Sequence, residues 1–435
     1  MSTLQPANWK TIPGPADIVT TRLPNGITVL ARSNFNSQSV VLSGYLPSGS
    51  IYDPVDRLGL AYFTAISLMR GNAHRNFQAI YNELESIGAS LSIGASVHTT
   101  SFGGRSLAED LPTLLALLSD SLRSPTFPSE YVERLRKQIL TSLAIREQDT
   151  SDIASMTFDQ ILFGGHPYAY PEDGFTETIQ NIRLEDLVAF HHDHYGPSGM
   201  VVAIVGGIDP QAAIAEVSAH FSDWDPNHHP PLPDLPQIQA PTEIVRRHMT
   251  IAGKSQTDIV MGGLGPKRTS PDYLAASLGN NILGQFGMMG RIGDVVREKS
   301  GLAYHASASL NAWLAAGSWE VSAGVNPSNV ERSIDLIRKE IRRFISEPVS
   351  AEELEDSQSH FIGRLPLSLE SNAGVAQAML KMHRFNLGLD YYQRYPAMVA
   401  GLTTEDVLDV AQRYLDPDRM VIVSAGANHQ QTKSE

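Results

Sequence analysis

Histidines gather at two places in the chain, and imidazole is a common protein ligand for zinc. The two groups are His191, His192 and His194 around Asp193, and the pair His228 and His229. Neighbouring helix residues point about 100° apart, so only His191 and His194 share a face, and no glutamate lies nearby at a metal-binding spacing. We therefore expect no metal site here. His166, in the turn GGHPYAY, is expected to be structural.

The residues needed for several other kinds of catalytic or binding site are absent from the sequence. The sequence contains no cysteine, which excludes disulfides, thiolate metal sites and cysteine nucleophiles. No G-x-S-x-G nucleophile elbow stands out. The stretch GQFGMMGR, with Gly284, Gly287 and Gly290, is not followed by a phosphate-loop lysine, which argues against nucleotide binding. These glycines permit tight turns and the close approach of another chain, or they form only a flexible loop.

The charge of the chain argues against two classes of partner. Its formal net charge is −14, whereas nucleic acids and anionic membranes attract Lys/Arg-rich patches. No run of about 18 apolar residues occurs, and the N-terminus lacks the basic and apolar regions of a signal peptide. We expect a soluble, cytoplasmic protein; a periplasmic location stays open if a signal peptide has been removed.

The elements that must position any site fall into two halves. A chain of 435 residues favours two or more domains. Residues 226–241 hold six prolines and predict an extended connector between a domain at 1–225 and a domain at 242–435.

The halves resemble each other at an offset of 220 residues. At this offset IRLEDLVAFHHDHYGPSGMVVAIVGG, from Ile182, aligns without a gap with LTTEDVLDVAQRYLDPDRMVIVSAGA, from Leu402. Each half also has an early strand, at 40–49 and 258–266, and the Asn25-Gly26 pair predicts a hairpin. Because strands and helices do not simply alternate, we predict an α+β fold of two homologous domains, each an antiparallel sheet with helices on one face.

Several motifs, in order and spacing, resemble the M16 (pitrilysin-like, inverzincin) metallopeptidases over nearly the whole chain. They are GLAYFTAISLMRGN, GASLSIGASVHTTSF, HPYAYPEDGFTETIQNIRLEDLVAFHHDHYGP and NNILGQFGMMGRIGDVVREKSGLAY. The chain is most similar to the short bacterial subunits and the mitochondrial processing peptidase subunits, which pair two chains of this size.

Active members carry H-x-x-E-H on a helix, where two imidazoles bind zinc and the glutamate activates a bound water. In this chain the corresponding residues are Tyr62, Ala65 and Ile66. The family's third ligand, a glutamate about 76 residues later, corresponds by counting to Ser142. The resemblance therefore implies that the zinc site is lost and that any zinc is held by a partner subunit.

The resemblance also implies a substrate-binding pair in the second half. The family has an arginine and a tyrosine seven residues apart that hold the substrate backbone and stabilise the tetrahedral intermediate, and REKSGLAY supplies Arg297 and Tyr304. Both side chains can donate hydrogen bonds to a carbonyl oxygen that gains charge. Without the resemblance, they would be read as a surface helix residue and a packed strand residue.

Three functions follow as hypotheses. We expect a catalytically incompetent subunit that pairs with a zinc-bearing M16 homologue to cleave unfolded peptides. The alternative is a structural or peptide-binding protein like the core subunits of the respiratory bc1 complex. A homodimeric enzyme with another active site ranks last.

Overall fold

Two compact units make up the computed structural model, which describes residues 12–226, 233 and 235–427. The first unit gathers the described residues of Met1–Leu143, Pro171–Asp234 and Leu365–Arg394. The second gathers those of Ala144–Tyr170, Leu235–Arg364 and Tyr395–Glu435. Each unit thus combines segments from both halves of the chain. The sequence-based borders at 225 and 242 stay a prediction, and most of residues 227–234 lie outside the described residues.

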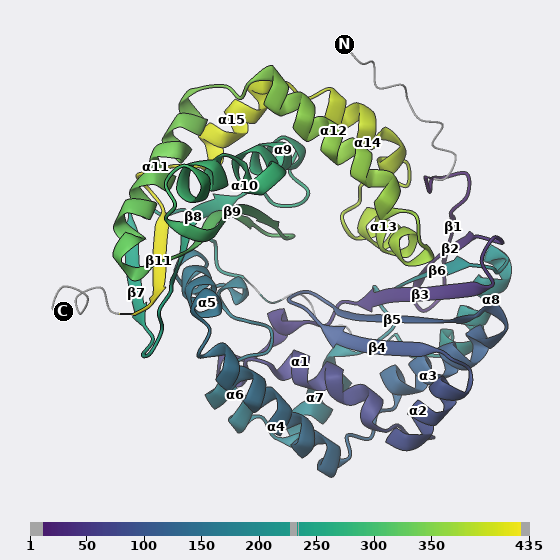
Figure 1. Ribbon diagram of the computed structural model, residues 1–435. Coiled ribbons are helices and arrows are strands. Elements are labelled where there is room, and N and C mark those ends of the chain that lie inside the picture. The colour runs from purple at the N-terminus through teal and green to yellow at the C-terminus, as the bar shows by residue number, and fades with distance from the viewer. Residues whose placement is uncertain (1–11, 227–232, 234, 428–435) are drawn as a thin grey trace. The chain divides into compact units, whose positions relative to one another are not determined.

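The first unit is built on a six-stranded sheet with the order β1-β2-β6-β3-β5-β4 (Figure 1). Its strands are β1 (Val19–Arg22), β2 (Thr28–Ser33), β3 (Ser39–Leu46), β4 (Ser90–Ala95), β5 (Thr100–Leu107) and β6 (Val201–Gly206). The predicted hairpin is confirmed, since β1 and β2 pair antiparallel and Gly26 has a φ of +96° at the turn. β2 and β6 run parallel, so the sheet is mixed.

Helices cover both faces of this sheet. The helices of the unit are α1 (Leu60–Ser67), α2 (Phe77–Ser86), α3 (Leu111–Arg123), α6 (Thr176–Asn181), α7 (Leu184–His194), α8 (Pro210–Phe221) and α13 (Asn372–Arg384). On β3, Val40, Leu42 and Leu46 enter the core beneath α1 and α3. Tyr45 points to the opposite face, where its hydroxyl lies 3.2 Å from His383 Nδ1 of α13.

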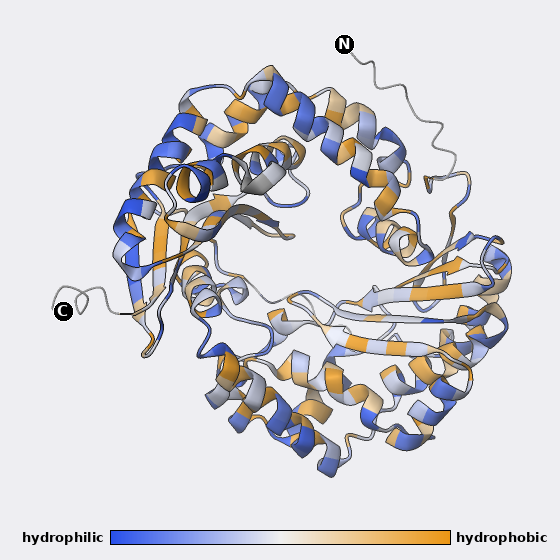
Figure 2. Ribbon diagram, viewed as in Figure 1, coloured by the Kyte–Doolittle hydropathy of each residue, from blue (hydrophilic) through white to orange (hydrophobic). Residues whose placement is uncertain are grey.

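The second unit has a five-stranded sheet with the order β7-β11-β8-β10-β9. Its strands are β7 (Val245–Thr250), β8 (Thr257–Gly265), β9 (Ala303–Ala312), β10 (Gly317–Val325) and β11 (Val421–Gly426), and β7 and β11 run parallel. Its helices are α5 (Thr150–Leu162), α9 (Tyr273–Gly284), α10 (Phe286–Gly293), α11 (Val330–Ser346) and α15 (Thr404–Tyr414). Apolar residues form stripes on the helices rather than whole circumferences, as expected of helices packed by one face (Figure 2).

This sheet is also covered on both faces. Trp319 of β10 is fully buried on the side of α9, where its ring lies against Gly279. On the other side the Thr150 hydroxyl of α5 donates to the buried Asp258 of β8. Every residue of β11 is buried accordingly.

Three further helices each begin in one unit and end in the other. They are α4 (Ser129–Arg146), α12 (Ala351–Ser368) and α14 (Tyr391–Ala400).

The predicted α+β class is confirmed, and the elements recur at the predicted offset of 220. α7 and α15 correspond residue for residue, as do β6 and β11. The glycines that end these strands, Gly206 and Gly426, share a φ of +154°, and a Cβ on either would clash with the neighbouring backbone. Two details of the prediction need correction. Each sheet is mixed rather than antiparallel. Each sheet also has a helix on its second face, α13 in the first unit and α5 in the second, and each of these helices comes from the other half of the chain.

Candidate functional site

Helix α1, which carries the three residues that the resemblance aligns with a zinc motif, begins at a sharp turn stabilised by a buried carboxylate. Gly59, with a φ of +94°, precedes the helix, and a Cβ there would lie 2.7 Å from Ile179 Cδ1. The Asp53 carboxylate accepts hydrogen bonds from the N–H groups of Gly59 and Ala61, both at 2.8 Å. Burial raises the pKa of Asp53 to about 7 although these donors favour the charged form. Sequence reasoning did not find Asp53, because a carboxylate seven residues before the first residue of a helix matches no capping pattern.

The three motif positions share one face of α1, as their spacing requires. Ala65 is fully buried, and Tyr62 and Ile66 are half-buried against the core of the first unit. Burial, and to a smaller degree the charge of Asp173, raises the pKa of the Tyr62 phenol. This face therefore presents a phenol and aliphatic side chains, which are poor partners for zinc at neutral pH.

Ser142 lies on α4 and is exposed, whereas its neighbour Leu143 is fully buried in the same core cluster as Phe63 of α1. Helix α4 therefore turns an aliphatic side chain, and not the serine hydroxyl, toward the core.

The histidines of α7 make local contacts. His191 Nε2 lies 2.8 Å from the Leu122 carbonyl, its ring stacks on Tyr195, and burial lowers its pKa. His192 pairs with Asp193 at 2.8 Å on the surface. Over residues 12–226, 233 and 235–427, no three His, Asp or Glu side chains come together as a set that could hold a metal ion. His228 and His229 lie outside the described residues.

Arg297 lies on a π-helical turn, Asp294–Glu298, that follows α10. The turn ends in a glycine motif closed by two backbone hydrogen bonds: Leu302 N–H donates to the Val296 carbonyl at 3.0 Å, and Gly301 N–H donates to the Arg297 carbonyl at 2.9 Å. Gly301 has a left-handed φ of +64°, which glycine adopts readily. Arg297 is 36% exposed, with Nε 3.5 Å from Glu298 Oε1.

Tyr304 lies just beyond this motif, at the start of β9. Val325 of β10 pairs with Ala303 and Gly324 pairs with His305, so Tyr304 is the extra residue of a β-bulge. A bulge redirects its side chain out of the regular alternation, and Tyr304 is accordingly 66% exposed. Bulges and π-turns are both frequent at functional sites. The structure thus brings Arg297 and Tyr304 onto one short connection, with polar groups that can donate to an incoming carbonyl.

The three glycines precede this connection and have different roles. A Cβ on Gly284 would lie 2.0 Å from the Ala308 nitrogen, so the end of α9 approaches β9 closely. Gly287 and Gly290 have φ values of +60° and +62°. A Cβ on Gly290 would meet Gly284 N at 2.6 Å, whereas one on Gly287 would meet nothing within 4 Å.

Comparison with known proteins decides the family. The description "Insulinase (Peptidase family M16)" matches residues 28–171, and "Peptidase M16 inactive domain" matches residues 181–360. The chain belongs to the M16 peptidase family. M16 structures also match its fold: a peptidase M16 inactive domain from Pseudomonas fluorescens has a TM-score of 0.88 and 28% identity, over 95% of this chain and 98% of that one.

Relatives of known sequence span nearly the whole chain as well. An uncharacterized zinc protease from Streptomyces coelicolor is 24% identical over 91% of this chain and 86% of its own length. The mitochondrial-processing peptidase subunit beta of Lentinula edodes is 25% identical over 92% of this chain and 88% of its own length. Within the described residues, no helix of this M16 protein is long and apolar enough to cross a membrane.

Proposed function

We propose that this chain is the zinc-less subunit of a two-chain M16 metallopeptidase. The observation that carries the proposal is the face of α1, where Tyr62, Ala65 and Ile66 stand at the spacing of the zinc motif and pack against the core. Once no metal offsets the desolvation of imidazole and carboxylate groups, apolar packing is the more stable use of a buried helix face.

In this proposal the zinc and the activated water belong to a homologous partner chain. Arg297 and Tyr304 bind the substrate backbone and donate hydrogen bonds to the carbonyl oxygen as it becomes an oxyanion. Tyr304 is exposed at a bulge seven residues after Arg297, which supports this role. The similarity to a protein named as one subunit of a processing peptidase supports a two-chain enzyme.

Co-expression with a zinc-bearing M16 homologue from the same organism tests the proposal. We expect no chelator-sensitive peptide hydrolysis from the isolated chain and clear hydrolysis from the complex. Arg297→Ala in the complex is expected to lower kcat by about 10²-fold or more, the usual effect of removing one oxyanion donor. Arg332→Ala, an exposed arginine of α11, is the matched control and is expected to change nothing.

Two outcomes contradict the proposal. Chelator-sensitive hydrolysis by the isolated chain would mean that it binds its own catalytic metal. An active complex in which Arg297→Ala and Tyr304→Phe have no effect would favour the structural role, like that of the bc1 core subunits.

A further inference from the structure

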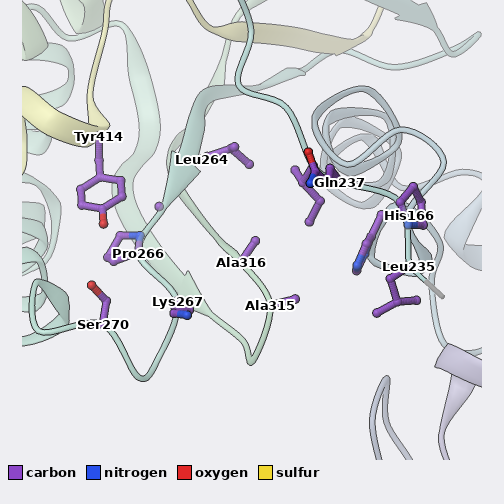
Figure 3. Close-up of a pocket in the computed structure, with 13 residues that line it drawn as sticks. His166, Leu235, Gln237, Leu264, Pro266, Lys267, Ser270, Ala315, Ala316 and Tyr414 are labelled. Atoms are coloured by element: carbon purple, nitrogen blue, oxygen red, sulfur yellow. The ribbon is translucent and has the colours of Figure 1, made fainter. Parts of the chain in front are cut away.

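The second unit contains a cavity of about 580 Å³, and neither Arg297 nor Tyr304 is among the residues that line it (Figure 3). It opens where the end of β8, the β9–β10 loop, the turn after α5 and residues 235–238 of the Pro-rich connector meet. Its lining residues are His166, Leu235, Pro236, Gln237, Ile238, Leu264, Gly265, Pro266, Lys267, Ser270, Ala315, Ala316 and Tyr414. A volume of this size suits a small organic ligand or a short peptide.

Hydrogen bonds and ring contacts fix the β9–β10 loop that forms one wall. Trp313 N–H donates to the Ala316 carbonyl at 3.0 Å, and Arg268 N–H donates to the Trp313 carbonyl at 2.9 Å. Ala315 N–H donates to the Tyr168 hydroxyl at 3.1 Å, and the Trp313 ring packs on Tyr168 with centroids 5.1 Å apart. The wall is therefore preorganised, which lowers the entropic cost of binding a ligand.

Polar groups lie at the two ends of the cavity and apolar groups lie between them. Figure 3 shows Lys267, Ser270 and Tyr414 toward one side and His166 and Gln237 toward the other. The side chains between them are those of Leu264, Ala315 and Ala316, and Pro266 lies beside the Lys267 group.

The Lys267 end is suited to an anion although the whole chain is acidic. None of the 13 lining residues is Asp or Glu. One carboxylate adjoins this end: Asp272, whose backbone N–H donates to Ser270 Oγ at 3.2 Å, accepts from Arg413 at 2.5 Å and from the Tyr414 hydroxyl at 2.8 Å. Its charge is compensated, so it opposes an anion beside Lys267 and Ser270 only weakly.

The His166 end offers hydrogen-bond donors. His166 is 2% exposed, and its Nδ1 accepts a hydrogen bond from Tyr168 N–H at 3.1 Å. Burial lowers the pKa of His166, so the ring is neutral at pH 7 and carries its proton on Nε2. Nε2–H and the Gln237 amide can each donate to a carbonyl oxygen.

We infer that this cavity binds the C-terminal end of a short peptide, with the free carboxylate at Lys267 and Ser270. An apolar C-terminal side chain packs on Leu264 and Ala316, and a backbone carbonyl accepts from His166 or Gln237. A fatty acid shares the carboxylate and the apolar body, but it would leave the donors of the His166 end without a partner, which costs binding energy. The inference is independent of the proposed catalytic role.

Calorimetric titration of the purified full chain tests this inference with three probes. The probes are N-acetyl-Ala-Ala-Leu with a free carboxylate, the same peptide as its C-terminal amide, and decanoate. We expect the peptide acid to bind with a Kd at least about tenfold lower than that of the amide or of decanoate.

Two variants locate the site, and one serves as control. Lys267→Gln is expected to remove the preference for the acid over the amide. Ala316→Leu, which places a larger side chain in the cavity, is expected to raise the Kd for the acid at least about tenfold. Lys254→Gln, in the turn between β7 and β8 and outside the cavity, keeps wild-type binding. Thermal midpoints equal to that of wild type show that the variants are folded.

Three results would each overturn the inference. They are the absence of binding at millimolar peptide, equal affinity for the acid and the amide, and tighter binding of decanoate than of the peptide. Full binding by folded Lys267→Gln and Ala316→Leu would place the peptide elsewhere, which also overturns it.

Discussion

At the level of single residues, the ionisation of Asp53, which lies at the start of α1, is expected to affect the free energy of unfolding. Its carboxylate is buried beneath the helix start and accepts from Gly59 and Ala61 N–H. Such donors favour the ionised form, yet loss of hydration is the larger effect and sets the pKa near 7. A carboxylate of this kind stays neutral in the folded chain under mildly acidic conditions in which the unfolded chain is ionised.

This difference predicts a pH dependence of stability. The pKa of Asp53 is about 7 in the folded chain, against 3.8 for a free carboxyl. Between these values the folded state binds the proton and the unfolded state does not. The contribution of Asp53 to the free energy of unfolding therefore rises as the pH falls from about 7 toward 4, by at most about 1.4 kcal/mol per pH unit.

Asp53→Asn measures this contribution directly. Thermal midpoints of wild type and variant from pH 8 to pH 5 should differ increasingly in favour of wild type as the pH falls. Asp56→Asn, at an exposed neighbour with a 74% exposed side chain, is the matched control and should leave the thermal midpoint close to that of wild type. A pH-independent difference for Asp53→Asn would mean that Asp53 is already ionised in the folded state at pH 5.

At the level of elements, Gly284 decides how closely α9 approaches β9. A Cβ at this residue would lie 2.0 Å from the Ala308 nitrogen and 2.6 Å from its Cα, and backbone atoms of a sheet cannot move aside cheaply. Gly284→Ala is therefore expected to reduce the free energy of unfolding by about 2 kcal/mol or more.

Another helical glycine provides the control. Gly363 lies exposed in α12, where a Cβ would meet nothing within 4 Å, so Gly363→Ala should stabilise the chain by up to about 1 kcal/mol. Denaturant midpoints of both variants check the pair. A Gly284→Ala variant as stable as wild type would show that α9 and β9 can separate without cost.

Local elements follow from sequence because their signals are local. The Asn25-Gly26 turn, the apolar spacing of α3 and α4, and the repeat that aligns α7 with α15 depend on residues close together in the chain. The bulge at Tyr304 and the parallel pairs β2–β6 and β7–β11 depend on strand neighbours far away in sequence, for which no local pattern exists. Arg297 and Tyr304 could be predicted because the family resemblance depends on a motif of residues close together in the chain. The Lys267 cavity could not be predicted, because it is lined by segments that lie far apart in the sequence.

At the level of the whole molecule, the chain is duplicated but its units are not its two halves. The first unit needs residues 365–394 for α13, which contacts β3 and β6 and buries several apolar side chains. They are Val375, Ala376, Ala378, Met379, Leu380 and Met382. The second unit needs residues 144–170 for α5, which buries Ala154, Phe158 and Leu162 beside β8 and β11.

This exchange of helices predicts how the halves behave when separated. A fragment of residues 1–225 lacks α13, and a fragment of residues 242–435 lacks α5, so each would expose one apolar or half-polar sheet face to water. Because each buried aliphatic or aromatic side chain contributes about 1.5–3 kcal/mol, the loss exceeds the usual stability of a domain. Each fragment expressed alone should aggregate or unfold without a cooperative transition.

When the two fragments are co-expressed, they should co-purify and unfold cooperatively at a temperature near that of the intact chain, because each supplies the helix that the other lacks. Circular dichroism melts and size-exclusion chromatography of the three preparations distinguish the outcomes. A cooperative melt of either fragment alone would show that its sheet is stable without the exchanged helix.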